Sequence, residues 1–169
     1  MPPVTPELIK QLREATSAGV MDCKKALEAS DGDIDKAKKI LGEMGIATAA
    51  KKADRVTAQG LVESYIHAGG RIGVIVEVAC ETDFVARTPD FKNLARDIAM
   101  QVAAMNPLAV SEEESLPDSA EGRVDEVVLL KQPWIKDGSK DIRQLINETI
   151  GKTGENIQVK RFARFEIGE

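Results

Sequence analysis

The spacing of apolar positions changes near residue 58 of the chain. Before that point apolar residues recur every three or four positions, which predicts short helices. The three expected stripes are Leu8-Ile9-Leu12, then Val20, Cys23 and Leu27, then Ile34, Ala37, Ile40, Leu41 and Met44. Thr5 and Asp33 are residue types that cap helix N-termini, and an Ala-rich stretch over residues 46–53 predicts a fourth helix. Helices this short are marginal alone, so we expect one small bundle.

After residue 58 the apolar positions alternate, which predicts strands. Ile72, Val74, Val76, Val78 and Cys80 form the most regular run, and residues 61–67 precede it across Ala68-Gly69-Gly70-Arg71. Two adjacent glycines between such runs favour a hairpin. Residues 157–167 alternate in the same way, so we expect a third strand.

Two longer helices are expected between the second and third strands. Thr88-Pro89 is a typical helix start, and an apolar face follows on Phe91, Leu94, Ile98, Val102 and Met105. Another helix carries Ile142, Leu145, Ile146 and Ile150, whereas residues 127–130 fit a short strand or a helix end equally well. The predicted fold class is α+β. A helical N-terminal domain (1–54) precedes a core domain (55–169) with a three-stranded antiparallel sheet packed with helices, and residues 51–55 form the linker.

Composition narrows the class of protein. The 169 residues carry a net charge of −5, and residues 111–126 hold seven acids and one base, so the rest of the chain is close to neutral. This balance argues against a general nucleic-acid binder, and the acidic run is typical of a solvated loop or helix face. Two distant cysteines and the lack of a membrane-length apolar window predict a cytoplasmic protein without membrane or direct nucleic-acid contact.

Candidate chemistry is sparse. Cys23, Cys80 and the single histidine, His67, lack the spacing of a metal site, so we expect no metal and no cofactor. No phosphate-binding loop of the GxxxxGK[ST] type is present, and the residues do not suggest an enzyme. By spacing alone, Phe84 fits a core position, Asp83 a helix start and His67 a polar strand end.

Three segments resemble the signatures of one protein family. Leu12–Leu27 (LREATSAGVMDCKKAL) and Glu77–Arg87 (EVACETDFVAR) resemble the two signature regions of elongation factor Ts, and Gly154–Phe162 (GENIQVKRF) is similar to the family's last strand. The resemblance is co-linear from Leu8 to Gly168, which makes it specific.

The resemblance implies a function in translation. Members of this family are guanine-nucleotide exchange factors for elongation factor Tu, the GTPase that delivers aminoacyl-tRNA. The N-terminal domain is similar to a ubiquitin-associated three-helix fold that docks on the GTPase, which implicates four residues: Leu12, Arg13, Met21 and Lys24. The core is expected to insert Asp83 and Phe84, flanked by Thr82 and Val85, beside the magnesium and phosphates of GDP. His67 is a weaker contact candidate.

Two departures from the family pattern stand out. Ser17 occupies a position where the family usually has glycine, and the stretch between Val110 and Val127 is shorter than the family norm. The chain also has one sheet-and-helix core where longer members have two, so we expect a homodimer through the sheet.

The alternative function is a passive protein-binding module that uses the three-helix domain.

Overall fold

The computed structural model describes residues 4–120 and 123–169, and these divide into two compact units. Of the described residues, unit 1 contains 4–54 and 147–154, and unit 2 contains 55–120, 123–146 and 155–169. Residues 1–3 of the predicted helical domain, and Glu121 and Gly122 of the acidic run, lie outside the described residues. Within the described residues, no helix is long and apolar enough to cross a membrane.

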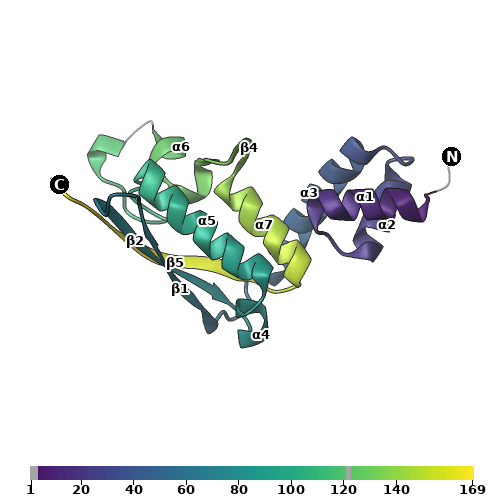
Figure 1. The fold of residues 1–169 in the computed structure, drawn as a ribbon, viewed down its shortest axis with the longest axis horizontal. Helices are drawn as coiled ribbons and strands as arrows, with labels where there is room; N and C mark the ends of the chain where they lie inside the picture. The colour runs from purple at the N-terminus through teal and green to yellow at the C-terminus, as the bar shows by residue number, and fades with distance from the viewer. Residues whose placement is uncertain (1–3, 121–122) are drawn as a thin grey trace. The chain divides into compact units, whose positions relative to one another are not determined.

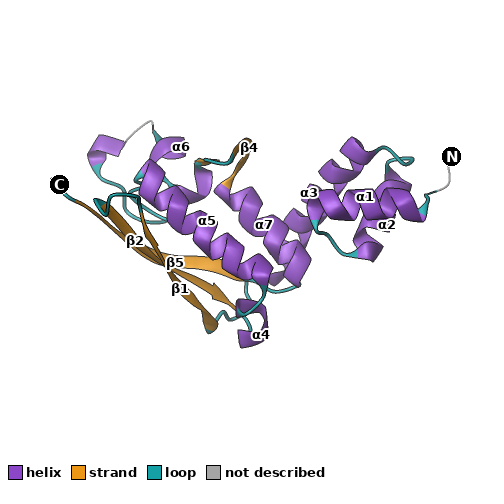
Figure 2. Ribbon diagram, viewed as in Figure 1, coloured by secondary structure: helices purple, strands orange, loops and turns teal. Residues whose placement is uncertain are grey.

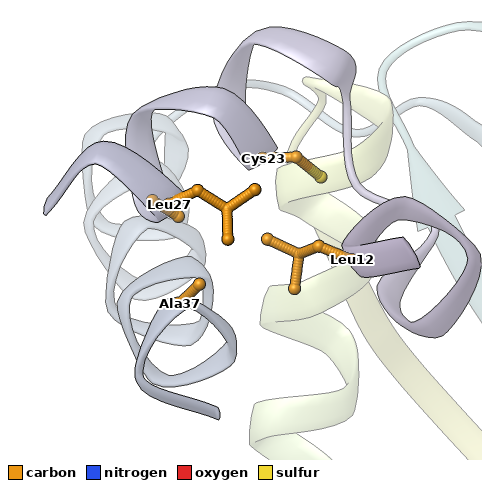
Figure 3. Packing of buried hydrophobic residues seen from close by; sticks show 5 residues of the cluster. Leu12, Cys23, Leu27 and Ala37 are labelled. Carbon is orange, nitrogen blue, oxygen red and sulfur yellow. The ribbon is translucent and has the colours of Figure 1, made fainter. Parts of the chain in front are cut away.

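Unit 1 is built on three helices: α1 (Pro6–Thr16), α2 (Val20–Ala29) and α3 (Ile34–Lys52). Thr5 and Asp33 cap α1 and α3 as predicted, since their side chains accept hydrogen bonds from Leu8 N and Lys36 N. A cluster of fully buried side chains holds the three helices together, and the N-terminal cluster consists of Leu12, Cys23, Ala26, Leu27 and Ala37. In Figure 3 the labelled side chains of this cluster point toward one another.

The separate fourth helix predicted over residues 46–53 is wrong, because α3 runs without a break from Ile34 to Lys52. The segment contains no proline, and its two glycines, Gly42 and Gly45, do not end the helix.

Gly45 has a packing role in unit 1. A Cβ at this position would lie 3.1 Å from the backbone oxygen of Asn147 in helix α7 (Ile142–Thr153), so glycine permits the close approach of the two helices.

Unit 2 contains the three-stranded antiparallel sheet expected from the alternation, with strand order β1-β2-β5. The strands are β1 (Gln59–Ile66), β2 (Ile72–Cys80) and β5 (Ile157–Glu166). Helix α5 (Pro89–Met105) starts at the Thr88 cap and lies along the inner face of the sheet (Figure 1). Val74, Val76 and Val78 of β2 are buried beneath it. The fold class is therefore α+β, as predicted.

The segment between α5 and α7 differs most from the expectation. A small two-stranded sheet of β3 (Pro133–Trp134) and β4 (Asp137–Asp141) was not anticipated, because two polar or very short strands leave no alternating pattern. Residues 127–130 resolve as the end of helix α6 (Val124–Val127), a single bridge from Val128 to Ala109 and a 3-10 turn over Leu129–Lys131. A further 3-10 turn covers Asp118–Ala120.

Ser17 ends α1 in a left-handed conformation, with φ 55° and ψ 13°. Its backbone N–H donates to Arg13 O at 2.7 Å, which closes the last turn of the helix. Residues with a Cβ are strained in this region of backbone space, whereas glycine is not. The geometry thus gives a physical reason for a glycine at this position.

We predict that Ser17→Gly raises the free energy of unfolding by about 1 kcal/mol, because it removes the Cβ from a left-handed residue. Chemical denaturation monitored by circular dichroism measures the change. Ser17→Ala is the matched control, since it deletes the hydroxyl but keeps the Cβ and should bring no gain. Equal stabilities for Ser17→Gly and Ser17→Ala would contradict this account.

Candidate functional site

The segment that joins β2 to α5 forms a short protruding turn, which we call the tip (residues 82–87). Helix α4 (Asp83–Ala86) makes up most of it and lies at the end of the sheet where β2 stops (Figure 2). Thr82 caps α4, since its hydroxyl oxygen accepts from Val85 N at 3.4 Å, and Thr88 caps the following helix α5. Two threonine caps six residues apart therefore produce two successive helix starts, and Asp83 begins the first of them, as its spacing suggests.

Phe84 is 76% exposed, although a phenylalanine is usually buried. Helix α4 packs through Ala86, which is 4% exposed. Two residues along a helix correspond to a rotation of about 200°, so Phe84 faces away from the side that packs. The core position that spacing alone suggests for Phe84 is thus wrong.

Asp83 lies at the first position of α4 and pairs with Arg87 one turn later. The carboxylate Oδ2 is 2.9 Å from Arg87 Nη2, with both side chains partly exposed. A pair of this kind contributes at most about 1 kcal/mol, so its main effect is to orient the carboxylate. The exposed ring of Phe84 and the oriented carboxylate of Asp83 thus lie side by side. Thr82 and Val85 are half-buried at the base of the tip.

Two acidic residues that the sequence analysis did not select hold the base of the tip. Glu155 accepts hydrogen bonds from the backbone N–H groups of Glu81 and Thr82, and from the Thr82 hydroxyl. Glu81 in turn accepts from Asn156 N at 2.7 Å. Glu155 and Thr82 are 73 positions apart, so only the pairing of β2 with β5 brings them together.

The thiol of Cys80 lies beneath the tip and is fully buried. Its Sγ contacts Thr82 O at 3.1 Å. Burial raises the pKa of the Cys80 thiol above its ordinary value, and the negative charge of Glu155 raises it further. A thiol that stays protonated is a poor nucleophile, so the position of Cys80 gives no support to covalent chemistry.

The predicted docking residues of unit 1 fall into two groups. Arg13, Met21 and Lys24 are exposed; Met21 is 62% exposed and Lys24 forms a surface ion pair with Glu28. Leu12 was predicted to lie on the docking surface, but the structure places it inside the N-terminal cluster, where it is 0% exposed. Its position in the signature reflects packing of the bundle, since Leu12 is the inward residue of an amphipathic helix.

His67 lies at the other end of the β1–β2 hairpin from the tip. Eight steps of about 3.4 Å along β2 separate the hairpin turn from Cys80, so the two regions are roughly 27 Å apart. The imidazole Nδ1 of His67 is 3.1 Å from the Tyr65 hydroxyl. The structure thus does not bring His67 together with Asp83 and Phe84.

No cluster of three or more histidine, cysteine, aspartate or glutamate residues suited to a metal ion occurs in residues 4–120 and 123–169. Part of the acidic run is tied to its surroundings: Glu114 accepts from Val110 N at 3.1 Å, and Glu112 pairs with Lys131 at 3.5 Å. These described acids are therefore partly accounted for by local contacts.

Comparison with known proteins identifies relatives across the whole chain. The family model described as "Elongation factor TS" matches residues 6–121. "Elongation factor Ts" of Desulforamulus reducens is 48% identical, and the match covers 100% of this chain and 91% of that protein. "Elongation factor Ts" of Heliobacterium modesticaldum is 50% identical (98% and 91% covered), and that of Thermotoga neapolitana is 48% identical (98% of each covered).

The burial of Cys80 generates a prediction about the rigidity of the tip. We expect iodoacetamide to label Cys80 and Cys23 of the folded protein about 100-fold more slowly than the unfolded chain, because both thiols are buried with a raised pKa. Peptide mass spectrometry after timed labelling measures both sites. Rapid labelling of Cys80 while Cys23 stays protected would show that the base of the tip opens readily.

Proposed function

The chain belongs to the elongation factor Ts family, and from that premise we propose that it is a guanine-nucleotide exchange factor that acts on elongation factor Tu. In this proposal it binds the GDP-bound form and promotes GDP release by inserting Asp83 and Phe84 beside the magnesium and phosphates. No covalent bond is made or broken in such a reaction.

The observation that carries the proposal is the exposure of Phe84 beside Asp83 on a short helix. A ring that is 76% exposed in the free protein gains free energy when a partner buries it. The flanking carboxylate brings negative charge to the same point. Against the metal-bound phosphates of a nucleotide, that charge competes with the phosphates for the cation.

Linkage explains how binding becomes release. A GTPase holds GDP through a phosphate cradle and a magnesium ion, so a distortion of the elements that hold the metal weakens the grip. A factor that binds the distorted state lowers the affinity for GDP, and GDP lowers the affinity for the factor by the same amount. The chain thus needs binding free energy rather than catalytic groups.

The tip alone is too small to supply that free energy. Burial of one phenylalanine ring contributes roughly 1.5–3 kcal/mol. A ten-thousandfold faster release requires about 5.5 kcal/mol. We therefore assign the remainder to additional contacts, with the exposed residues Arg13, Met21 and Lys24 of unit 1 as the docking surface.

The outer face of the sheet supports self-association as part of this function. Five large apolar side chains, at half or more exposure, line it: Val62, Ile66, Ile75, Phe165 and Ile167. The register places Ile66, Gly73 and Phe165 opposite one another, and a hollow of about 400 Å³ lies at this point. Exposed apolar surface of this kind is typical of an interface.

A second copy of the chain is the occupant we propose for this face. Two identical apolar faces related by a twofold axis are complementary to each other, and a dimer supplies the second core that longer relatives carry within one chain. An ion pair between Glu77 and Arg161, with Arg161 Nε 2.8 Å from Glu77 Oε2, lies in the next rows of the same face and would border the apolar contact.

We predict that Phe84→Ala slows factor-stimulated GDP release about 30-fold, which corresponds to the loss of roughly 2 kcal/mol from an anchor ring. The measurement is the release of fluorescent GDP from elongation factor Tu in a stopped-flow experiment. Val56→Ala is the matched control, because Val56 is 80% exposed in the same unit and lies outside the tip.

Release that stays near the wild-type rate with Phe84→Ala would contradict the insertion of the tip. A wild-type chain that binds elongation factor Tu without accelerating release would instead favour the passive binding module.

We predict that the chain is a dimer at micromolar concentration and that Phe165→Glu makes it a monomer, because a charge would then be buried at the apolar centre of the interface. Light scattering coupled to size-exclusion chromatography measures the mass of each. Val56→Glu is the control for a new charge elsewhere on the unit. A monomeric wild-type chain would remove the proposed interface.

A further inference from the structure

The hydrogen bonding between β2 and β5 continues past the end of their ladder through side chains. The last ladder pair is Cys80 with Ile157. Beyond it, Glu155 Oε2 accepts from Glu81 N at 3.1 Å and from Thr82 N at 3.0 Å. Carboxylate oxygens thus occupy the acceptor role that strand carbonyls fill within the ladder, and they hold the two residues just before α4.

The same carboxylate also determines how the cap of α4 is oriented. The Thr82 hydroxyl donates to Glu155 Oε1 at 2.5 Å, and its oxygen accepts from Val85 N at 3.4 Å. A hydroxyl has one proton, so a donor bond to Glu155 leaves its lone pairs for the helix N–H. Four residues cannot hold a helical conformation alone, so the direction of α4 depends on these anchors.

The anchors of the tip are the hydrogen bonds that the side chains of Glu155 and Glu81 accept. These bonds are partly shielded from water and involve charged groups, which strengthens them. The side chain of Glu81 is 20% exposed, and Arg55 Nη1 lies 3.6 Å from its Oε2. Asn156 donates from its backbone N to Glu81 and from its side chain to Arg55 O. Hydrogen bonds to an ionised acceptor are shorter and stronger than neutral ones, so the base of the tip is held in one geometry.

We propose that Glu155 is a positioning residue for nucleotide exchange: it holds Thr82 and α4 so that Phe84 projects in one direction. This inference rests on the exchange function proposed above. Glu155 does not reach the partner in this role, and it acts through Thr82. Glu155 contributes to the preorganisation of the tip. A Phe84 ring without this anchor would lose orientational freedom on insertion, and that loss of entropy would offset part of the binding free energy.

Substitution of Glu155 by glutamine provides the test. A glutamine side chain has one acceptor oxygen and an NH₂ donor, so it cannot accept from both backbone N–H groups and the Thr82 hydroxyl as the carboxylate does. Glu155→Asp keeps the charge on a shorter side chain and should restore part of the function. Glu63→Gln is the matched control, since Glu63 lies on β1 away from the tip.

The readout is a saturation curve of fluorescent GDP release from elongation factor Tu. We expect Glu155→Gln to lower the maximal release rate about tenfold. The concentration for half-saturation should change less than about threefold, because the docking surface is intact. Glu155→Asp should fall between the two proteins, and Glu63→Gln should match wild type. An unchanged maximal rate for Glu155→Gln overturns the proposal.

A double-mutant cycle with Phe84→Ala separates positioning from general stability. If Glu155 acts through the ring, Glu155→Gln has little further effect once the ring is gone. An equal loss of rate in both backgrounds overturns the proposal. If Phe84→Ala alone releases GDP at the normal rate, the proposed insertion of Phe84 is wrong. That result is distinct from a failure of the proposal for Glu155. If circular dichroism shows Glu155→Gln to be unfolded, Thr82→Val, which replaces the hydroxyl by a methyl group of similar size, takes its place in the cycle with the same two outcomes.

Discussion

The antiparallel pairing of β2 with β5 is the interaction on which the rest of unit 2 depends. It buries the valines of β2 beneath α5 on one face and exposes an apolar row on the other. At the end of the ladder it brings Glu155 to Thr82, across 73 positions of sequence. The core, the outer face and the tip are thus three consequences of one strand pairing.

The apolar side chains of the outer sheet face and of α4 are exposed for different physical reasons. On the outer sheet face the side chains alternate with those that pack on α5, so period-two geometry leaves them in water. On α4 the exposure of Phe84 follows because the helix packs through its other side, where Ala86 is buried. In the free protein these apolar side chains remain in contact with water. A partner that buries them gains the hydrophobic free energy of that burial.

Much of this fold could be predicted from the sequence because its signals are local. Thr5, Asp33 and Thr88 are side-chain caps, and each begins a helix as its residue type predicts. The β1–β2 hairpin follows from alternation around two glycines with positive φ. The β3–β4 pair could not be predicted, because its strands are too short or too polar to leave an alternating pattern. The unbroken α3 was missed, because its two glycines do not end the helix.

The candidate site was only partly predictable. Asp83 and Phe84 were selected through family resemblance, whereas spacing alone would have placed Phe84 in the core. The same resemblance also selected Leu12, because a signature contains residues that pack as well as residues that bind. Glu155 lies inside a recognised segment, but its contacts with Glu81 and Thr82 depend on strand register, which no local pattern encodes.

The most direct test of the central claim is the structure of this chain bound to nucleotide-free elongation factor Tu. The account predicts that the Phe84 ring, exposed in the free chain, is buried against the elements of the GTPase that hold the magnesium and phosphates. A complex in which Phe84 remains in solvent, while other surfaces make the contact, would contradict it.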